Sequence, residues 1–439
     1  MSGRGSGGGP SRGASEPSLS TWARDGVGAI LVVLALGLAF RVIIAYAYPG
    51  TGLQFDLVSF RFWADNLASQ GLAGFYDRPF LHDYTPGYLY VLAGIGWLSQ
   101  AIAGAPGHVG DMIKLPPIIA DVAIGWLVWS MALELGASRR AALIGAALAV
   151  ANPISWFDSV TWGQVDSFGV VFLLLGLREL WRDRPERSAI WTVIAALIKP
   201  QLGILIPIVA IVTIRRALWP AGGFGRPDPI LATAEHEDDA AADDGILARL
   251  RVWEGRTDQP IRIVSTALAG FLTAVILCAP FGLHVLDVGG AGAPIKSGLI
   301  EQVAKTAGGY PYVSVNAYNP WALAELDGNG LAKNGAWLCD AIIRDPLPGG
   351  TVCNEAVQIG PLPAVVVGTA ALLAAFLVVI AFVAWRPDRL TLLLGLTLAA
   401  IAFFVLPTRV HERYLYPFFA LGAIVAGISW RWLAGYVVL

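Results

Sequence analysis

Long, nearly uninterrupted apolar stretches recur along most of this chain and define its predicted architecture. Several approach the length of about 20 residues that a helix needs to cross the hydrocarbon core of a membrane. The stretches are Val27–Ala47, Tyr84–Ala103, Met112–Leu135, Ala141–Trp156, Ser167–Trp181, Ser188–Ile214, Ile263–Val285, Leu362–Trp385, Leu390–Leu406 and Tyr414–Trp430. A buried helix in a soluble core could explain one or two of them, but not this many. The pattern predicts an all-α, polytopic integral membrane protein.

Composition supports this prediction. The chain is 56% hydrophobic and 14% charged, whereas about 25% of residues are charged in soluble proteins. Residues 1–26 are rich in Gly, Ser and Pro with scattered Arg, which is typical of a disordered tail and not of a cleaved signal peptide. Residues 27–439 then form one multispanning membrane domain. The net charge of −2 indicates no particular partner, and we expect no nucleic-acid partner.

Arginine positions predict the orientation, because Lys and Arg mark the cytoplasmic side of a membrane protein. Arg4, Arg12 and Arg24 precede the first apolar stretch and place the tail inside. The same rule, applied to the later arginine clusters, gives about ten transmembrane helices with both termini cytoplasmic. It also gives two larger extracytoplasmic loops, residues 48–111 and 284–360, and a cytoplasmic loop, residues 215–262. The expected location is the cell membrane.

Two stretches are not predicted to be simple crossings. A full crossing by Tyr84–Ala103, which contains Pro86 and three glycines, would invert every later arginine cluster. We therefore expect a lying or partly embedded helix within the first external loop, with a true crossing as the alternative. Ser188–Ile214 is interrupted by Lys199-Pro200-Gln201. Proline ends or kinks a helix, so this stretch is expected to be a hairpin with Lys199 at its outer tip.

This topology places polar residues suited to binding a sugar or a phosphate on the outer face. Carboxylates and amides bind hydroxyl groups, and Lys, Arg and His bind phosphate. The expected binding and catalytic residues on this face are Asp56, Arg61, Asp121, Gln164, Asp166, Lys199, Gln201, Asn316, Asn319, His411, Glu412 and Arg413. Asp65 and Asp83 are on the same face and are equally well explained as loop or capping residues.

Two further features of the sequence are specific. Asp121 lies within an apolar stretch, where a charge is costly, and is expected to pair with Lys114 or with Arg41. Cys339 and Cys353 are close in sequence in the second external loop, where a disulfide is chemically possible. No His/Cys spacing resembles a zinc site.

Four short strings, in their order along the chain, resemble a known superfamily. They are Trp162-Gly163-Gln164-Val165-Asp166, Lys199-Pro200-Gln201, Asn316-Ala317-Tyr318-Asn319 and His411-Glu412-Arg413-Tyr414. With the acid Asp56 in the first external loop, they resemble the GT-C superfamily of polyprenyl-phosphate-sugar glycosyltransferases, and within it bacterial relatives of the GPI mannosyltransferase II family. The string Asp83–Pro86 is also similar to dolichol-linked glucosyltransferases. The His-Pro-Asp-Glu pattern of eukaryotic GPI enzymes is absent, so no shared metal requirement follows.

The resemblance implies transfer of a hexose, with mannose as the expected sugar, from a polyprenyl-phosphate donor to a hydroxyl of a lipid or glycan acceptor. The reaction would invert the sugar, with Asp56 as general base. Asp166, the second catalytic candidate, would orient the acceptor or bind a divalent cation such as Mg²⁺ or Mn²⁺. The donor phosphate would be bound by Lys199, His411 and Arg413. Arg61, Asp121, Gln164, Gln201, Asn316, Asn319 and Glu412 would bind the rest of the substrates.

The alternative function is a secondary transporter or lipid flippase, which also uses broken helices and intramembrane charges. Such a protein is expected to centre its polar groups near the bilayer midplane. A non-catalytic scaffold would need no convergent polar set.

Overall fold

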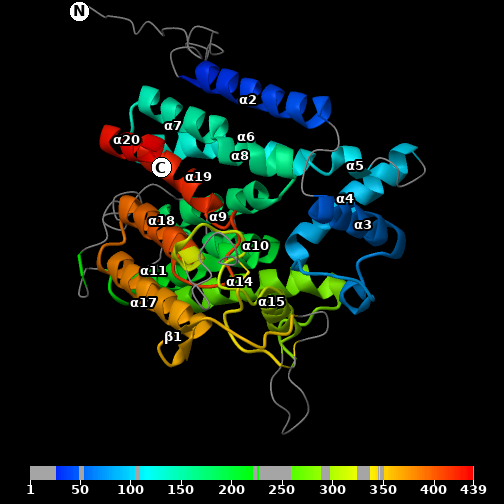
Figure 1. The fold of residues 1–439 in the computed structure, drawn as a ribbon. Coiled ribbons are helices and arrows are strands. Elements are labelled where there is room, and N and C mark those ends of the chain that lie inside the picture. The colour runs from blue at the N-terminus through cyan, green and yellow to red at the C-terminus, as the bar shows by residue number, and fades with distance from the viewer. Residues whose placement is uncertain are drawn as a thin grey trace, which may run out of the picture.

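The computed structural model describes residues 26–48, 54–103, 109–220, 225–226, 259–287, 297–323, 337–344, 346 and 351–438. The predicted N-terminal tail and most of the predicted cytoplasmic loop lie outside these residues. The described part is mostly helical (Figure 1). Its exceptions are a two-stranded hairpin, β1 (Gln358–Ile359) with β2 (Leu362–Pro363), and a few isolated bridges.

Within the described residues, five helices are long and apolar enough to cross a membrane. They are α2 (Val27–Ala47), α6 (Leu115–Glu134), the segment Pro200–Leu218, the segment Ile261–Phe281 that contains α14 (Ile261–Cys278) and η6 (Ala279–Phe281), and α17 (Ala364–Trp385). A bent pair spanning 139–162 makes a sixth candidate, and α18 (Arg389–Val405) and α19 (Tyr416–Ala426) are shorter apolar helices. These helices fit a polytopic membrane protein, whereas the count of ten crossings stays a prediction.

Helix bounds agree with the apolar pattern where no proline intervenes. α2 covers the same residues as the first predicted stretch. The stretch Ala141–Trp156 is not one straight helix: α7 (Arg139–Ala151) is followed by α8 (Pro153–Trp156) and the π-helical turn η3 (Phe157–Trp162), with a bend of 40°. Pro153 cannot continue the hydrogen bonds of α7, and Asn152 Oδ1 instead accepts the Ile154 N–H at 2.9 Å.

The predicted hairpin around Lys199 is present. α10 (Pro185–Ile198) leads into the 3₁₀ segment η4 (Pro200–Leu205) and then α11 (Ile206–Leu218). Near the end of α11, Arg216 Nη1 lies 3.0 Å from Asp183 Oδ1, just before α10 begins. The two helices therefore run back along each other, and Lys199 is at the turn between them.

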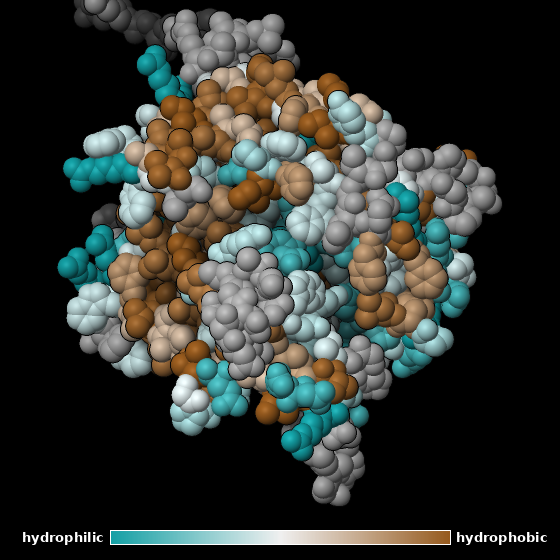
Figure 2. Space-filling model, in the orientation of Figure 1, coloured by the Kyte–Doolittle hydropathy of each residue, from teal (hydrophilic) through white to brown (hydrophobic). Residues whose placement is uncertain are grey.

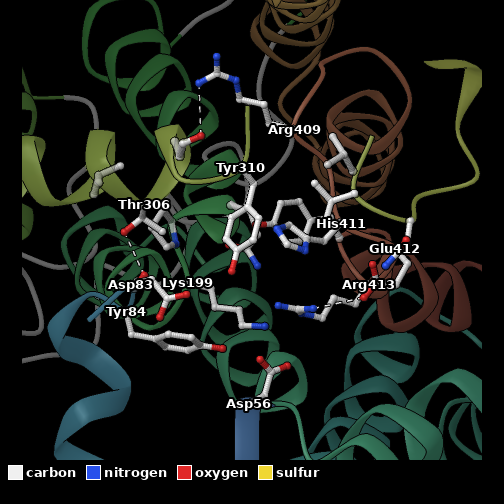
Figure 3. Close-up of a pocket in the computed structure, with 18 of the residues that line it drawn as sticks. Asp56, Asp83, Tyr84, Lys199, Thr306, Tyr310, Arg409, His411, Glu412 and Arg413 are labelled. Carbon is white, nitrogen blue, oxygen red and sulfur yellow. Dashed lines mark hydrogen bonds and ion pairs between the residues drawn. The ribbon is translucent and has the colours of Figure 1, made fainter. Parts of the chain in front are cut away.

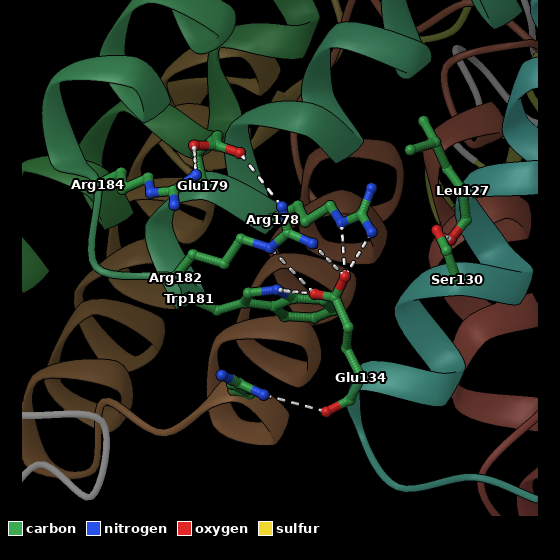
Figure 4. A network of polar contacts seen from close by, with 9 residues as sticks. Leu127, Ser130, Glu134, Arg178, Glu179, Trp181, Arg182 and Arg184 are labelled. Atoms are coloured by element: carbon green, nitrogen blue, oxygen red, sulfur yellow. Dashed lines mark hydrogen bonds and ion pairs between the residues drawn. The ribbon is translucent and has the colours of Figure 1, made fainter. Parts of the chain in front are cut away.

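α9 (Asp166–Trp181) runs through the middle of the bundle, with Leu173, Leu177 and Trp181 fully buried. At its far end, Glu134 of α6 accepts hydrogen bonds from Arg178 and Arg182, and from Trp181 Nε1 at 3.0 Å (Figure 4). Arg389 of α18 donates to the Glu134 backbone oxygen at 3.1 Å. This cluster holds α6, α9 and α18 together at the end opposite Asp166, so the start of α9 has a fixed position.

A second buried cluster joins the first helix to the last apolar one. Arg41 Nε of α2 lies 2.7 Å from Asp121 Oδ2 of α6, and Tyr416 of α19 donates to Asp121 Oδ1 at 2.9 Å. Both members of the ion pair are fully buried. Of the two predicted partners of Asp121, Arg41 is the one that pairs with it. Lys114 instead precedes α6, whose first residue is Leu115.

The predicted first external loop is largely helical. It contains α3 (Gln54–Gln70), η1 (Phe75–Asp77), α4 (Pro86–Ala103) and the short α5 (Val109–Met112). α3 and α4 lie side by side at one end of the bundle (Figure 1). A side chain at Gly96 would meet the Ala64 backbone oxygen at 2.3 Å, so this glycine permits their close approach. Whether α4 lies in the interface or crosses stays a prediction.

The predicted second external loop rests on the first. Its helix α15 (Gly298–Gly308) is followed by η7 (Pro320–Leu323). Gln302 Nε2 donates to the His82 oxygen at 2.7 Å, and Thr306 Oγ1 donates to the Asp83 oxygen at 3.0 Å. The chain ends with the short helix α20 (Trp430–Val438). These contacts bring residues just before α4 beside the later loop, where the site is formed.

Candidate active site

A cavity of about 610 Å³ lies where the two predicted external loops meet the helix ends. Its wall combines the start of α3, the residues before α4, the turn between α10 and η4, the end of α15 with the segment after it, and residues 407–414. In the space-filling view, hydrophilic residues gather in a hollow near the middle of the face, between hydrophobic surfaces (Figure 2). The arrangement is that of a polar site bordered by apolar surface.

One side of the cavity carries two carboxylates (Figure 3). Asp56 lies in the first turn of α3, and its Oδ2 accepts a hydrogen bond from Gln164 Nε2. Asp83 lies in the segment before α4 and is fixed through its backbone oxygen by Thr306. Burial raises the pKa of Asp83, and the neighbouring Asp56 carboxylate acts in the same direction, against a hydrogen bond and two cations. Asp83 therefore accepts a proton more readily than an ordinary aspartate.

Two cations line the same cavity: Lys199, which is buried and lies beside Asp83 and Tyr84, and Arg413, whose side chain is 15% exposed (Figure 3). Lys199 Nζ lies 2.6 Å from Asp166 Oδ2, and Arg413 Nε lies 3.7 Å from the same oxygen. Arg413 Nη1 also lies 3.3 Å from Glu412 Oε1, and its guanidinium is over the Trp162 ring at 5.7 Å. Asp166 thus lies behind the cations and orients them.

The expected divalent cation does not fit Asp166. Its Oδ2 already contacts Lys199 and Arg413, and these charges would repel a dication bound to the same oxygen. Within the described residues, no group of three or more His, Cys, Asp or Glu side chains is placed to hold a metal ion.

Gln164 connects Asp56 with Lys199. Its Nε2 donates to Asp56, while its Oε1 accepts from Lys199 Nζ at 3.2 Å and from Tyr84 OH at 3.3 Å. The chain turns here because the Asp158 oxygen accepts the N–H groups of Gly163 and Gln164 at 2.9 and 2.8 Å. Gly163 has φ 85°, and a side chain there would meet Leu57. The glycine in the Trp-Gly-Gln string thus lets Gln164 reach both Asp56 and Lys199.

His411 lies between the Tyr310 and Tyr414 rings, at centroid distances of 5.0 and 5.1 Å. Burial lowers the pKa of His411 to about 3, and the charges of Arg413 and Lys199 act in the same direction. The imidazole is therefore neutral at neutral pH. It can hydrogen-bond a phosphate, but it adds no positive charge to that of the two cations.

Of the other expected substrate-binding residues, Gln201, Asn316 and Glu412 line the cavity. Asn316 Oδ1 accepts a hydrogen bond from the Trp337 indole at 3.1 Å, and Trp337 also lines the cavity. The expected disulfide between Cys339 and Cys353 is formed two residues further on. Sequence reasoning did not single out Trp337, and it placed Asp83 on the outer face without assigning it to the site. The Asp83–Pro86 string was the available signal for Asp83.

Four expected substrate-binding residues do not line the cavity: the buried Gln164, described above, and Asp121, Asn319 and Arg61. Asp121 forms an ion pair with Arg41 and accepts a hydrogen bond from Tyr416, as described above. Asn319 is buried, and its Nδ2 donates to the Phe404 oxygen at 2.9 Å. Arg61 lies against Gly110, where an added Cβ would be 3.2 Å from Arg61 Nε. Their surroundings are those of residues that hold helices and loops together.

The low pKa of His411 predicts a loss of stability in acid. Because the folded-state pKa of about 3 is below the ordinary value of 6.5, the unfolded chain binds the proton first. His411 therefore contributes stability that is complete above pH 6.5 and is lost as the pH falls toward 3. The limiting slope for one proton is about 1.4 kcal/mol per pH unit.

This effect is measured as the Tm of the detergent-solubilised protein between pH 5 and 7.5. The Tm of His411→Gln should fall less steeply with decreasing pH than that of the wild type, since glutamine does not titrate. His284→Gln changes an exposed histidine and should keep the wild-type slope. Parallel slopes for the wild type and His411→Gln would contradict the prediction.

No protein-family model matches the chain, and no curated protein matches it. Among solved structures, the fold is similar to the crystal structure of the Archaeoglobus fulgidus oligosaccharyltransferase in the apo form. The two share 15% sequence identity with a TM-score of 0.43, over 91% of this chain and 50% of that chain. The chain thus spans about half the length of the solved protein that it resembles.

Proposed function

We propose that this chain is a membrane glycosyltransferase of GT-C type. It moves a hexose, with mannose as the expected sugar, from a polyprenyl-phosphate donor to a hydroxyl of a lipid or glycan acceptor. The observation that carries the proposal is that one cavity is lined by the Asp56 carboxylate and by two cations, the buried Lys199 and the partly exposed Arg413.

This arrangement suits displacement at the anomeric carbon. The acceptor hydroxyl attacks that carbon and gives its proton to Asp56, while the bond from the carbon to the donor phosphate oxygen breaks. Attack from the face opposite the leaving phosphate inverts the sugar. The phosphate leaves with an additional negative charge, which Lys199 and Arg413 would offset.

The other residues have supporting roles in this proposal. Asp166 holds Lys199 and Arg413 in place, and Gln164 orients Asp56 toward them. Gln201, Asn316 and Glu412 are placed to bind sugar hydroxyls, and neutral His411 to donate a hydrogen bond to the phosphate. Asp83 is a second possible proton acceptor on the same wall.

We further propose that the cavity faces the extracytoplasmic side of the cell membrane, with both termini cytoplasmic. The arginine cluster around Glu134 at the far end of α9 supports this orientation. A cavity at the ends of α9 and α10 also favours an enzyme over a transporter, which is expected to bind its substrate near the middle of the membrane.

The test is transfer of radiolabelled mannose from a short-chain polyprenyl-phosphate-mannose to lipid extract or glycan acceptors by the purified protein. We expect a labelled product and release of polyprenyl phosphate in equal amounts. Heat-treated protein is the control. Failure with every phosphate-linked hexose donor, together with donor transport by sealed proteoliposomes, would favour the transporter. For the orientation, an acceptor that cannot cross the membrane should be labelled by intact spheroplasts without permeabilisation.

A further inference from the structure

The disulfide Cys339–Cys353 closes a segment that is placed against the cavity wall. We call residues 337–344 and 351–357, the described part of this segment, the disulfide loop. Trp337 at its start lines the cavity, whereas Asp340 does not line it and is fully buried. Asp340 is next to a disulfide cysteine and has no exposed surface. A buried carboxylate is costly unless it is paired.

Among the described residues, the hydrogen bonds to the Asp340 carboxylate come from two consecutive residues. Arg409 Nε and Nη2 donate to its two oxygens at 2.8 and 3.0 Å, and Thr408 Oγ1 donates at 2.6 Å. Arg409 Nη1 also donates to the Ala307 backbone oxygen at 3.4 Å. A two-point contact between a guanidinium and a carboxylate fixes orientation as well as distance. Asp340 therefore determines where residues 408 and 409 lie.

The backbone at Arg409 is held in an unusual conformation. Its φ is 64°, in the left-handed region that non-glycine residues rarely adopt. Such a conformation persists where the surroundings hold it. Here the Arg409 N–H donates to the Tyr312 oxygen at 2.9 Å, and its side chain is held by Asp340.

The turn fixed in this way carries the donor-facing residues. His411, Glu412 and Arg413 lie two to four residues after Arg409, and all three line the cavity. Asp340 itself is held by backbone hydrogen bonds to residues outside the disulfide loop, because its N–H donates to the Pro311 oxygen at 2.9 Å and its oxygen accepts from Val365 at 3.2 Å. The disulfide adds a covalent link beside these bonds.

We propose that Asp340 is a positioning residue that sets the place of His411 and Arg413 through Arg409 and Thr408. The proposal rests on the proposed function, since it assigns the effect of Asp340 to use of the phosphate-linked donor. A residue that serves only stability would change the amount of active enzyme and leave the Michaelis constants unchanged. A positioning residue changes the Michaelis constant of the donor.

The test compares Asp340→Asn with Asp388→Asn. Asp388 is a matched control, because its carboxylate accepts from Thr391 N at 3.0 Å and Thr391 Oγ1 at 2.9 Å, at the start of α18 and away from the cavity. In Asp340→Asn the donor KM should rise about tenfold or more, with the acceptor KM nearly unchanged. Asp388→Asn should leave both constants unchanged. A wild-type donor KM in folded Asp340→Asn would overturn the proposal.

A second measurement does not depend on activity. Hydrogen exchange of the amides at 410–414 in the ligand-free protein should speed up by about tenfold or more in Asp340→Asn, and not in Asp388→Asn. Thr408→Val, which removes one of the three bonds, should give a smaller increase if Asp340→Asn does not fold. Unchanged exchange in the folded variants would overturn the positioning role of Asp340. A wild type without any transfer activity would overturn only the proposed function.

Discussion

Replacing Asp56 with asparagine should abolish sugar transfer while the protein still folds and inserts into the membrane. The amide keeps the shape of the carboxylate and can still contact Gln164, but it cannot accept the proton of the acceptor hydroxyl. Positioned general bases typically contribute about 10²–10⁴-fold to rate. Turnover of the purified variant should fall by at least that range, with a Tm close to the wild-type value.

Two further variants show whether the effect is specific. Asp65→Asn changes an acid on the same helix that does not line the cavity, and it should keep near-wild-type turnover. Asp83→Asn tests the second carboxylate of the wall. If Asp83→Asn stops transfer and Asp56→Asn does not, the base is Asp83 and the assignment of Asp56 is wrong.

Arg413→Ala and Lys199→Ala should impair use of the donor much more than use of the acceptor. Each removes one of the two cations that line the cavity, beside the proposed leaving phosphate. Loss of one hydrogen bond to a charged group costs about 1.5–3 kcal/mol, which is roughly a ten- to hundredfold change. We expect donor KM to rise, or donor kcat/KM to fall, by this factor. The acceptor KM should stay nearly constant in the same assays.

Lys305→Ala is the matched control for these cations. It removes an exposed lysine of α15 that does not line the cavity, so both Michaelis constants should be unchanged. A change in Arg413→Ala or Lys199→Ala that affects only the acceptor would place the phosphate elsewhere. Wild-type kinetics in both would leave these side chains as structural partners of Asp166 alone.

The fold could be predicted from the sequence where one local pattern decides the structure. α2 is an unbroken apolar stretch, and its bounds agree with the prediction. The turn at Lys199 follows from Pro200. The helical content of residues 54–103 was only partly predicted, because α3 is neither membrane-length nor strongly patterned, and its packing on α4 depends on contacts such as that at Gly96.

The site could be predicted only in part, for a different reason. Asp56, Lys199 and Arg413 lie in recognisable strings or beside apolar stretches, and the structure brings them to one cavity. Asp121 was also conspicuous, yet a charge within a helix is equally conspicuous when it pairs with Arg41 inside the bundle. Asp340 follows a cysteine in an irregular loop, and nothing local distinguishes it from a surface acid. Its contacts with Arg409 come from residues far away in the sequence.

The residues that line the cavity are spread along most of the chain, from Asp56 in the first external segment to Arg413 in the last turn before α19. During synthesis, Asp56 and Lys199 therefore reach the membrane before Arg413. In the proposed function, a nascent chain still in the translocon would hold an incomplete site for a lipid-linked phosphate. Capture of such a lipid would then mark the moment at which biogenesis is finished.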